Sequence, residues 1–271
     1  MKLFLSTLSI LTLILLYPVD TPTQEFYGKA VYQTKTKMEL GNWGARMSEA
    51  QKKQIEARLK NRLEKTYTLS FNKTESIFKE EEVLDAISGA TDSWGKNFTP
   101  GESYKNIADN ELVQTQEFYG KKFLVKDKIL EIDWKMGTES KQVGQYMCFK
   151  ATASVPSKAL TWYEFSWGEL RSAEKPEGEA GVAMTEIEAW YTPQVPVGHG
   201  PAEFAGLPGL IMEVSFGGTT MLCSKIVINP KEKVKIQAPD KGKEIGKISY
   251  KETVVKKMTE MRNNRGRRRS R

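Results

Sequence analysis

The chain has 271 residues, with 41 Lys and Arg against 34 Asp and Glu, a formal net charge of +7, one His and two Cys. Its hydrophobic share of 39% and its 21 Gly are those of a soluble domain, which excludes a disordered polar chain, a multi-span membrane protein and a collagen-like fibre. A single His excludes metal and catalytic schemes that need two, and two Cys cannot build a zinc finger.

Residues 1–23 are predicted to be a secretory signal peptide. Met1 and Lys2 form a short positive start, residues 3–17 are almost unbroken Leu, Ile, Ser and Thr, and Pro18 ends the run. An apolar stretch of about 15 residues is shorter than the ~20 that a membrane-spanning helix needs, although an uncleaved anchor stays open. We therefore expect cleavage between Pro18 and Gln24 and a mature protein that is periplasmic, outer-membrane-associated or secreted.

The mature chain begins with a predicted strand and a predicted helix. Residues 27–38 are rich in β-branched and aromatic side chains, which favours a strand. A helix is predicted at about 48–63, because Ser48 and Gln51 have the spacing of a capping box. An apolar stripe at helical spacing supports it: Ile55, Leu59 and Leu63.

Strand patterns dominate after this helix. Alternation predicts strands over 67–71 and 76–78, and a stretch rich in Gly, Ser and Asn predicts a long loop over 88–110. Further strands are predicted at 112–118, 123–126, 129–134, 145–153 and 185–191.

The clearest hairpin follows near residue 217. Two glycines at 217–218 form a two-residue turn between apolar runs. This turn places Phe216 opposite Thr219 and Val214 opposite Met221.

Together these elements predict a mainly β (α+β) domain over residues 24–248, built on a single curved antiparallel sheet or half-barrel. Residues 249–271 are expected to form a helix, at about 249–262, and a basic tail. The helix would bury a stripe of Val254, Met258 and Met261.

Cys148 and Cys223 are a candidate disulfide, because an exported chain folds where disulfides persist. The bridge would close a loop of ~75 residues and contribute a few kcal/mol. Two unpaired buried thiols stay open as the alternative. A catalytic thiol is disfavoured, since His199 is the only His that could activate it.

The whole surplus of positive charge lies in residues 256–271, where eight Lys and Arg and one Glu sum to +7. A run such as residues 267–269 is typical of nucleic-acid binding, but export argues against a nucleic-acid partner. Two interpretations stay open. The tail is a solvated end, or it is an arm attracted to an anionic membrane surface or an acidic partner.

A search for chemistry finds no catalytic, metal-binding or cofactor motif. The chain lacks G-x-S-x-G, H-E-x-x-H, G-x-x-x-x-G-K-[ST] and C-x-x-C. His199 near Glu203 could form a proton-transfer couple, but a loop His beside a surface acid is the simpler interpretation. No catalytic residue, metal ligand or cofactor is therefore predicted.

The segment from Trp190 to Phe216 stands out by its Pro and Gly content. Proline fixes φ and glycine permits positive φ, so the segment is expected to specify one conformation. It is either a tight corner that feeds the core or a rigid loop that presents a groove to a partner, and the corner is favoured. The motif residues are Trp190, Gly200, Pro201, Gly206, Leu207, Pro208, Gly209, Leu210 and Ile211.

This segment resembles the GLPGLI family, which takes its name from the hexapeptide at 206–211. The run at 189–201 is similar to the family's upstream block. Other similar blocks are 69–71, 76–78, 134–135, Tyr146, 150–151, 239–243 and 256–258, so the resemblance spans most of the mature chain. It implies export across the inner membrane of a Gram-negative bacterium and association with outer-membrane TonB-dependent receptors. It implies no activity and no site residues.

We expect a non-enzymatic envelope protein that binds a protein partner, such as an outer-membrane receptor, or an apolar or peptide ligand on the concave face of its sheet. Two alternatives stay open. One is an envelope hydrolase that uses carboxylates from 88–110 or 80–82, and it requires two convergent acids. The other is a purely structural envelope component.

Overall fold

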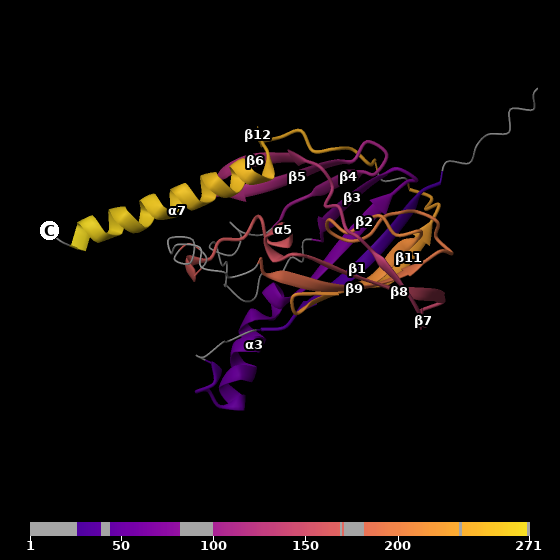
Figure 1. The fold of residues 1–271 in the computed structure, drawn as a ribbon, viewed down its shortest axis with the longest axis horizontal. Coiled ribbons are helices and arrows are strands. Elements are labelled where there is room, and N and C mark those ends of the chain that lie inside the picture. The colour runs from indigo at the N-terminus through magenta and orange to yellow at the C-terminus, as the bar shows by residue number, and fades with distance from the viewer. Residues whose placement is uncertain are drawn as a thin grey trace, which may run out of the picture.

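The computed structural model of the chain describes residues 26–38, 44–81, 100–168, 170, 182–232 and 235–269. The predicted signal peptide lies outside the described residues, as do residues 88–99 of the predicted 88–110 loop. Within the described residues, twelve strands form one sheet (Figure 1).

The elements have the following bounds. The strands are β1 (Gly28–Thr36), β2 (Glu64–Phe71), β3 (Glu75–Glu80), β4 (Ser103–Asn106), β5 (Glu111–Phe118), β6 (Lys121–Asp127), β7 (Lys135–Val143), β8 (Tyr146–Pro156), β9 (Met184–Thr192), β10 (Leu210–Phe216), β11 (Thr219–Ile228) and β12 (Lys243–Ile245). The helices are α3 (Glu49–Leu63), α5 (Ser157–Leu160) and α7 (Lys247–Arg269).

The sheet is open and mixed. Its order is β12-β6-β5-β4-β3-β2-β1-β11-β10-β9-β8-β7, so β12 and β7 are its edges. All neighbours pair antiparallel except β12, which pairs parallel with β6. The expected mainly β fold is confirmed. The prediction of a wholly antiparallel sheet is wrong at β12, because a strand of three residues is too short to give a sequence pattern.

The sheet is strongly curved, as the connection between β6 and β7 requires. These strands are positions 2 and 12 in the order, ten steps apart, yet only residues 128–134 join them. Ten steps in a flat sheet would span roughly 48 Å at ~4.8 Å each. Eight Cα–Cα intervals reach at most ~28 Å. The sheet must therefore bend its ends toward each other, which agrees with the curved sheet or half-barrel predicted.

The hairpin of β10 and β11 has the predicted register. Phe216 pairs with Thr219 and Val214 with Met221. Gly217 has φ +50° and Gly218 has φ +77°, the left-handed values that a tight hairpin turn of this twist requires.

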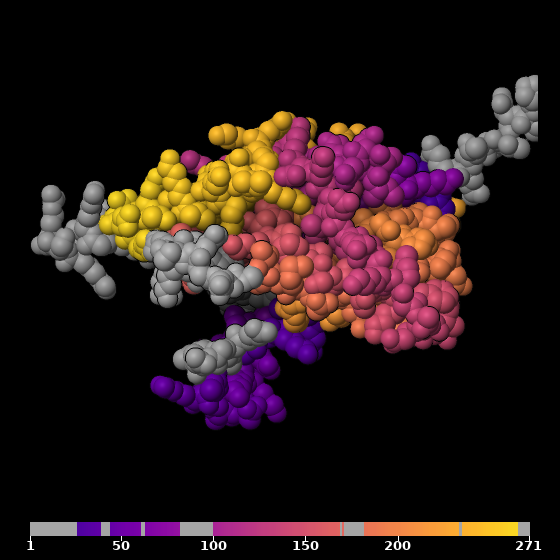
Figure 2. Space-filling view, in the orientation of Figure 1, coloured from indigo at the N-terminus to yellow at the C-terminus, as the bar shows by residue number. Residues whose placement is uncertain are grey.

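Helix α3 begins as predicted. The Ser48 side chain accepts from the Gln51 backbone N–H, and the Gln51 side chain accepts from the Ser48 backbone, which completes the capping box. The predicted apolar stripe is only half-buried, because α3 extends away from the sheet (Figures 1 and 2).

Several stretches differ from the sequence predictions. Residues 129–134 are not a strand but part of the connection between β6 and β7. Residues 103–106 of the predicted loop form strand β4, and no helix was predicted at α5. Helix α7 extends to Arg269, beyond the predicted end at 262, and its C-terminal part projects past the sheet (Figure 1).

One face of the sheet, the inner face, carries the core and is defined by residues paired across β2 to β6: Leu69, Phe78, Ser103, Gln114 and Val125. Helix α7 packs over one part of this face. Its Tyr250, Val254 and Met258 are buried against Phe118, Phe123, Val125 and Trp162, with Met261 partly buried. The predicted stripe of α7 is thus confirmed. Among the described residues, no helix combines the length and apolar character that crossing a membrane requires.

Candidate functional site

The motif loop, residues 193–209 between β9 and β10, packs into the core. Its Val195, Val197, Phe204 and Leu207 are each at most 3% exposed. Among the nine predicted motif residues, only Gly206 and Pro208 are exposed, and the others are buried. The motif therefore lies mainly inside the molecule, as expected of a corner that feeds the core.

Three glycines of the motif loop are required for different structural reasons. Gly206 has φ +92°, which L side chains rarely adopt. Gly209 is required by close approach, because a Cβ there would lie 2.3 Å from the backbone oxygen of Thr192. Gly200 is similarly crowded, with a Cβ expected 2.7 Å from Cδ1 of Ile211. The hexapeptide thus folds the loop back onto the end of β9.

A buried lysine of β4 holds the turn of the motif loop. Lys105 is 0% exposed, and its Nζ donates to the carbonyl oxygens of Gly200 at 2.8 Å and Phe204 at 2.9 Å. Burial lowers the pKa of Lys105 to about 7, and the negative charge of Glu203 opposes this shift. Lys105 fixes the position of residues 200–204 above the sheet.

Glu203 connects the same turn to Trp162 and to Lys247 of helix α7. One carboxylate oxygen accepts from Trp162 Nε1 at 2.6 Å, and the other accepts from Lys247 Nζ at 2.5 Å. Lys247 also lies 5.6 Å from the centre of the Trp162 ring. Both oxygens of Glu203 are therefore engaged by groups outside the motif loop.

His199 is a buried residue of the motif loop. Its Nε2 lies 3.1 Å from the backbone oxygen of Asn72, and since a carbonyl only accepts, Nε2 is the protonated nitrogen. Burial and the Lys105 charge lower the pKa of His199 to about 3. His199 and Glu203 have separate partners in the described part of the chain, so the structure gives no proton-transfer couple between them.

A pocket of about 100 Å³, partly open to solvent, lies beside this turn on the inner face. The Ala202–Phe204 part of the motif loop forms one wall. Aromatic side chains make up much of the lining: Tyr67, Phe78, Tyr163, Phe204 and Phe216. Tyr67 and Phe78 stack, with ring centres 4.7 Å apart and an angle of 11° between the planes. The pocket is shaped for an apolar or aromatic group.

The pocket also has a polar part. Ser103 and Gln114 line it and are each 3% exposed. Within the described residues, Ser103 Oγ and Gln114 Nε2 have no hydrogen-bond partner. Most buried polar groups in folded proteins are hydrogen-bonded, and these two are among eight buried side-chain atoms of the described residues that are not. They are the two of the eight that belong to residues lining the pocket.

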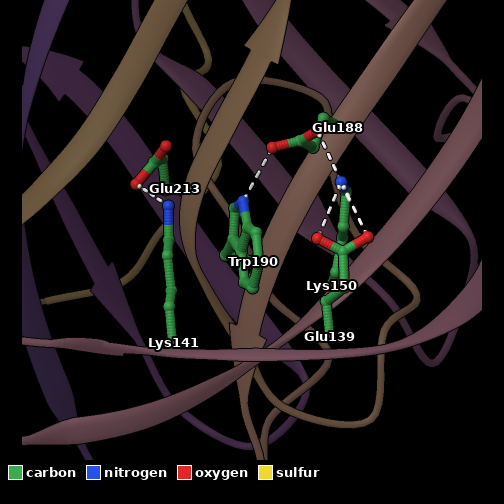
Figure 3. Close-up of polar contacts among 6 residues, drawn as sticks. All are labelled: Glu139, Lys141, Lys150, Glu188, Trp190 and Glu213. Carbon is green, nitrogen blue, oxygen red and sulfur yellow. Dashed lines mark hydrogen bonds and ion pairs between the residues drawn. The ribbon is translucent and has the colours of Figure 1, made fainter.

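Trp190 is enclosed by a network of charges across β7 to β10 (Figure 3). Lys141 Nζ lies 4.3 Å and Lys150 Nζ 5.7 Å from its ring centre, and its Nε1 donates to Glu188 at 2.9 Å. This hydrogen bond lowers the pKa of Glu188, and Lys150 adds to the effect. The lysines are held by the ion pairs Lys141–Glu213 at 2.7 Å, Lys150–Glu139 at 3.1 Å and Lys150–Glu188 at 3.1 Å. Trp190 therefore joins strands of the sheet and is only 7% exposed.

The candidate disulfide is not formed in the structure. Cys148 and Cys223 are free and buried, as in the alternative of two unpaired thiols. Cys148 Sγ donates to the Tyr146 carbonyl at 3.7 Å and Cys223 Sγ to that of Lys225 at 3.5 Å. Burial raises the pKa of Cys148 to about 11 and that of Cys223 to about 12, which suppresses the reactive thiolate.

The carboxylates considered for hydrolysis are engaged separately where they are described. Glu80 pairs with Lys65 at 2.8 Å, and Glu81 accepts from the Thr68 hydroxyl. Glu82 and residues 83–99 lie outside the described residues. The described parts of the chain contain no group of three or more His, Cys, Asp or Glu that could hold a metal ion.

A family model matches part of the chain. Residues 134–213 match the model of a family described as "Protein of unknown function (Porph_ging)". The matched range contains the hexapeptide, but the match does not carry the GLPGLI name. No curated protein matches the chain in sequence.

Two solved structures are similar to the chain, titled "Structure of PNGF-II in C2 space group" and "Structure of PNGF-II in P21 space group". Their TM-scores are 0.48 and 0.47, and their sequence identities 14% and 15%. Each match covers 84% of this chain and 32% of the PNGF-II chain, so the chain spans about a third of that protein's length.

Sequence reasoning missed the polar residues of the pocket, Ser103 and Gln114, and the buried Lys105 that holds the motif loop. Ser103 and Lys105 fell in the predicted loop, because a four-residue strand gives too short a pattern. Gln114 lay in a predicted strand but reads as a surface residue. The available signal was the spacing of Gln114 and Gln116, which places both on the same face as buried Leu112.

Proposed function

We propose that the chain is an exported, non-enzymatic protein of the cell envelope that binds an apolar or peptide ligand in the pocket on the inner face of its sheet. The observation that carries the proposal is the aromatic lining around buried polar groups without partners. The apolar N-terminal segment and the resemblance to an exported family support the location. An outer-membrane receptor is the protein partner that this resemblance favours.

The pocket favours ligand binding over the alternatives. A purely structural component needs no cavity, and a hydrolase needs convergent acids. Glu203, the one carboxylate in the described lining of the pocket, has its two oxygens occupied by Trp162 and Lys247. Such a carboxylate positions the motif loop and is not free to act as an acid or base.

The proposal is tested by isolating the mature tagged protein from cell envelopes and measuring retained molecules by native mass spectrometry. The matched variants are Ser103→Leu, which fills the pocket, and Gln33→Leu, at an exposed position of β1. We expect a reproducible small ligand on the wild type and on Gln33→Leu, and its loss from Ser103→Leu. Thermal unfolding checks that both variants fold. No reproducible ligand on the wild type, or one retained equally by Ser103→Leu, would refute the proposal.

A further inference from the structure

Two polar side chains that line the pocket are neighbours in the sheet. Ser103 of β4 and Gln114 of β5 are directly paired in the sheet and project to the inner face. Each is more than nine-tenths buried, and Ser103 Oγ and Gln114 Nε2 lack partners among the described residues. A buried polar group without a partner costs roughly 1–3 kcal/mol, so a ligand that supplies the partner recovers that loss.

The chemistry of these atoms selects the ligand group. An amide nitrogen only donates, and a hydroxyl can donate or accept. A carbonyl oxygen has two lone pairs and can accept from both at once. The complementary group is therefore a hydrogen-bond acceptor, and a carbonyl suits the pair.

The charges near the pocket disfavour an ionised ligand. Glu203 is the charged residue in the described lining, and Lys247 and Trp162 already hold its oxygens. A carboxylate ligand would meet Glu203 and lose its hydration among aromatic walls. An ammonium ligand would face the donors of Gln114 without a free carboxylate to pair with.

Resting on the proposed function, we infer that the pocket takes an uncharged ligand with an apolar or aromatic body and a carbonyl group, whose oxygen accepts hydrogen bonds from Gln114 and Ser103. Ketones, esters and amides share this chemistry. The aromatic walls hold the body, and the two polar side chains select the carbonyl.

The test uses two single-ring aromatic probes of equal length, acetophenone, which carries a carbonyl, and ethylbenzene, which has a methylene in its place. We expect the purified mature protein to bind both in NMR titrations. Gln114→Met should weaken acetophenone binding about tenfold, or 1.4 kcal/mol, without weakening ethylbenzene binding. Ser103→Ala should act in the same direction, and Gln33→Met, on the exposed part of β1, should change neither probe.

The outcomes separate this inference from the function on which it rests. Equal effects of Gln114→Met and Ser103→Ala on the two probes would overturn the carbonyl preference and leave the pocket as an apolar site. Binding of both probes that survives Ser103→Leu, or no binding to the wild type, would overturn the pocket itself. Because Gln114→Met and Ser103→Ala are independent, one misfolded variant still leaves the other to decide.

Discussion

His199 is the chain's only histidine, and it is held neutral. Its pKa is about 3 in the folded protein, below its usual 6.5, because of burial and the nearby Lys105 charge. The unfolded chain therefore binds a proton that the folded protein does not, between pH 6.5 and about 3. Stability from this residue is fully present above pH 6.5 and is lost as the pH falls through this window.

We predict that the wild type loses about 2 kcal/mol more stability than His199→Gln between pH 7.5 and 5. The variant keeps a donor for the Asn72 carbonyl but has no titratable ring. Urea unfolding at several pH values measures the difference, and the contribution of Lys105 is common to both proteins. Parallel pH curves would mean that folding does not shift the pKa of His199.

Gly209 gives a second prediction about a single residue. Gly209→Ala should reduce the free energy of unfolding by about 3 kcal/mol, because its Cβ would lie 2.3 Å from the Thr192 oxygen and Thr192 pairs with Leu210 in the sheet. The control is Gly198→Ala in the same loop, where the nearest atom is 3.5 Å away and the cost should stay within about 0.5 kcal/mol. Equal losses in urea unfolding would contradict the close-approach explanation.

The structural role of a single residue could be predicted only where its residue type, such as Pro or Gly, has few structural roles. The Pro and Gly of the motif loop indicated a fixed conformation, and its burial agrees. Lys105 gave no such signal, because a buried lysine and a surface lysine look alike in sequence. Its position depends on the carbonyls of Gly200 and Phe204, nearly a hundred residues away.

Elements with strong local patterns were predictable, and elements that depend on distant partners were not. The capping box of α3 and the two-glycine hairpin turn depend only on residues close together in the sequence, and both are confirmed. Residues 129–134 have the apolar character of a strand but pair with none, because they join opposite ends of the sheet. Their Trp134 instead donates to the carbonyl of Ala205 at 2.9 Å.

At the scale of single elements, the packing of helix α7 predicts how its residues contribute to stability. Met258 is 1% exposed and packs on the sheet, whereas Ile248 of the same helix is 77% exposed. Met258→Ala should cost about 2–5 kcal/mol of unfolding free energy, and Ile248→Ala less than about 0.5 kcal/mol. Chemical unfolding measures both. A small loss for Met258→Ala would show that α7 is not part of the cooperative core.

At the scale of the whole molecule, the curvature of the sheet determines which segments surround the pocket. A short link between β6 and β7 bends the sheet, and the motif loop and α7 then fill much of its inner face. The pocket lies beside Ala202–Phe204, where Lys105 and Glu203 hold the loop. No single segment encodes this pocket, which explains why its residues could not be predicted from the sequence.

The charge distribution is also a property of the whole chain. The surplus of +7 lies in residues 256–271, and α7 carries these positions to Arg269, past the sheet (Figure 1). An anionic membrane surface attracts such a segment by about 1 kcal/mol for each basic residue near it, and salt screens the attraction. This geometry favours the arm over the solvated end.

We predict that the mature protein sediments with phosphatidylglycerol vesicles at low salt, and much less at high salt or with phosphatidylcholine alone. Replacing the six Arg of residues 262–271 by Gln lowers the net charge from +7 to +1 and should abolish this binding. Replacing the same six by Lys keeps the charge and should preserve it, because the attraction depends on charge and not on guanidinium geometry. If the wild type fails to sediment at low salt, the tail is a solvated end; if the Gln variant still sediments, another surface contacts the membrane.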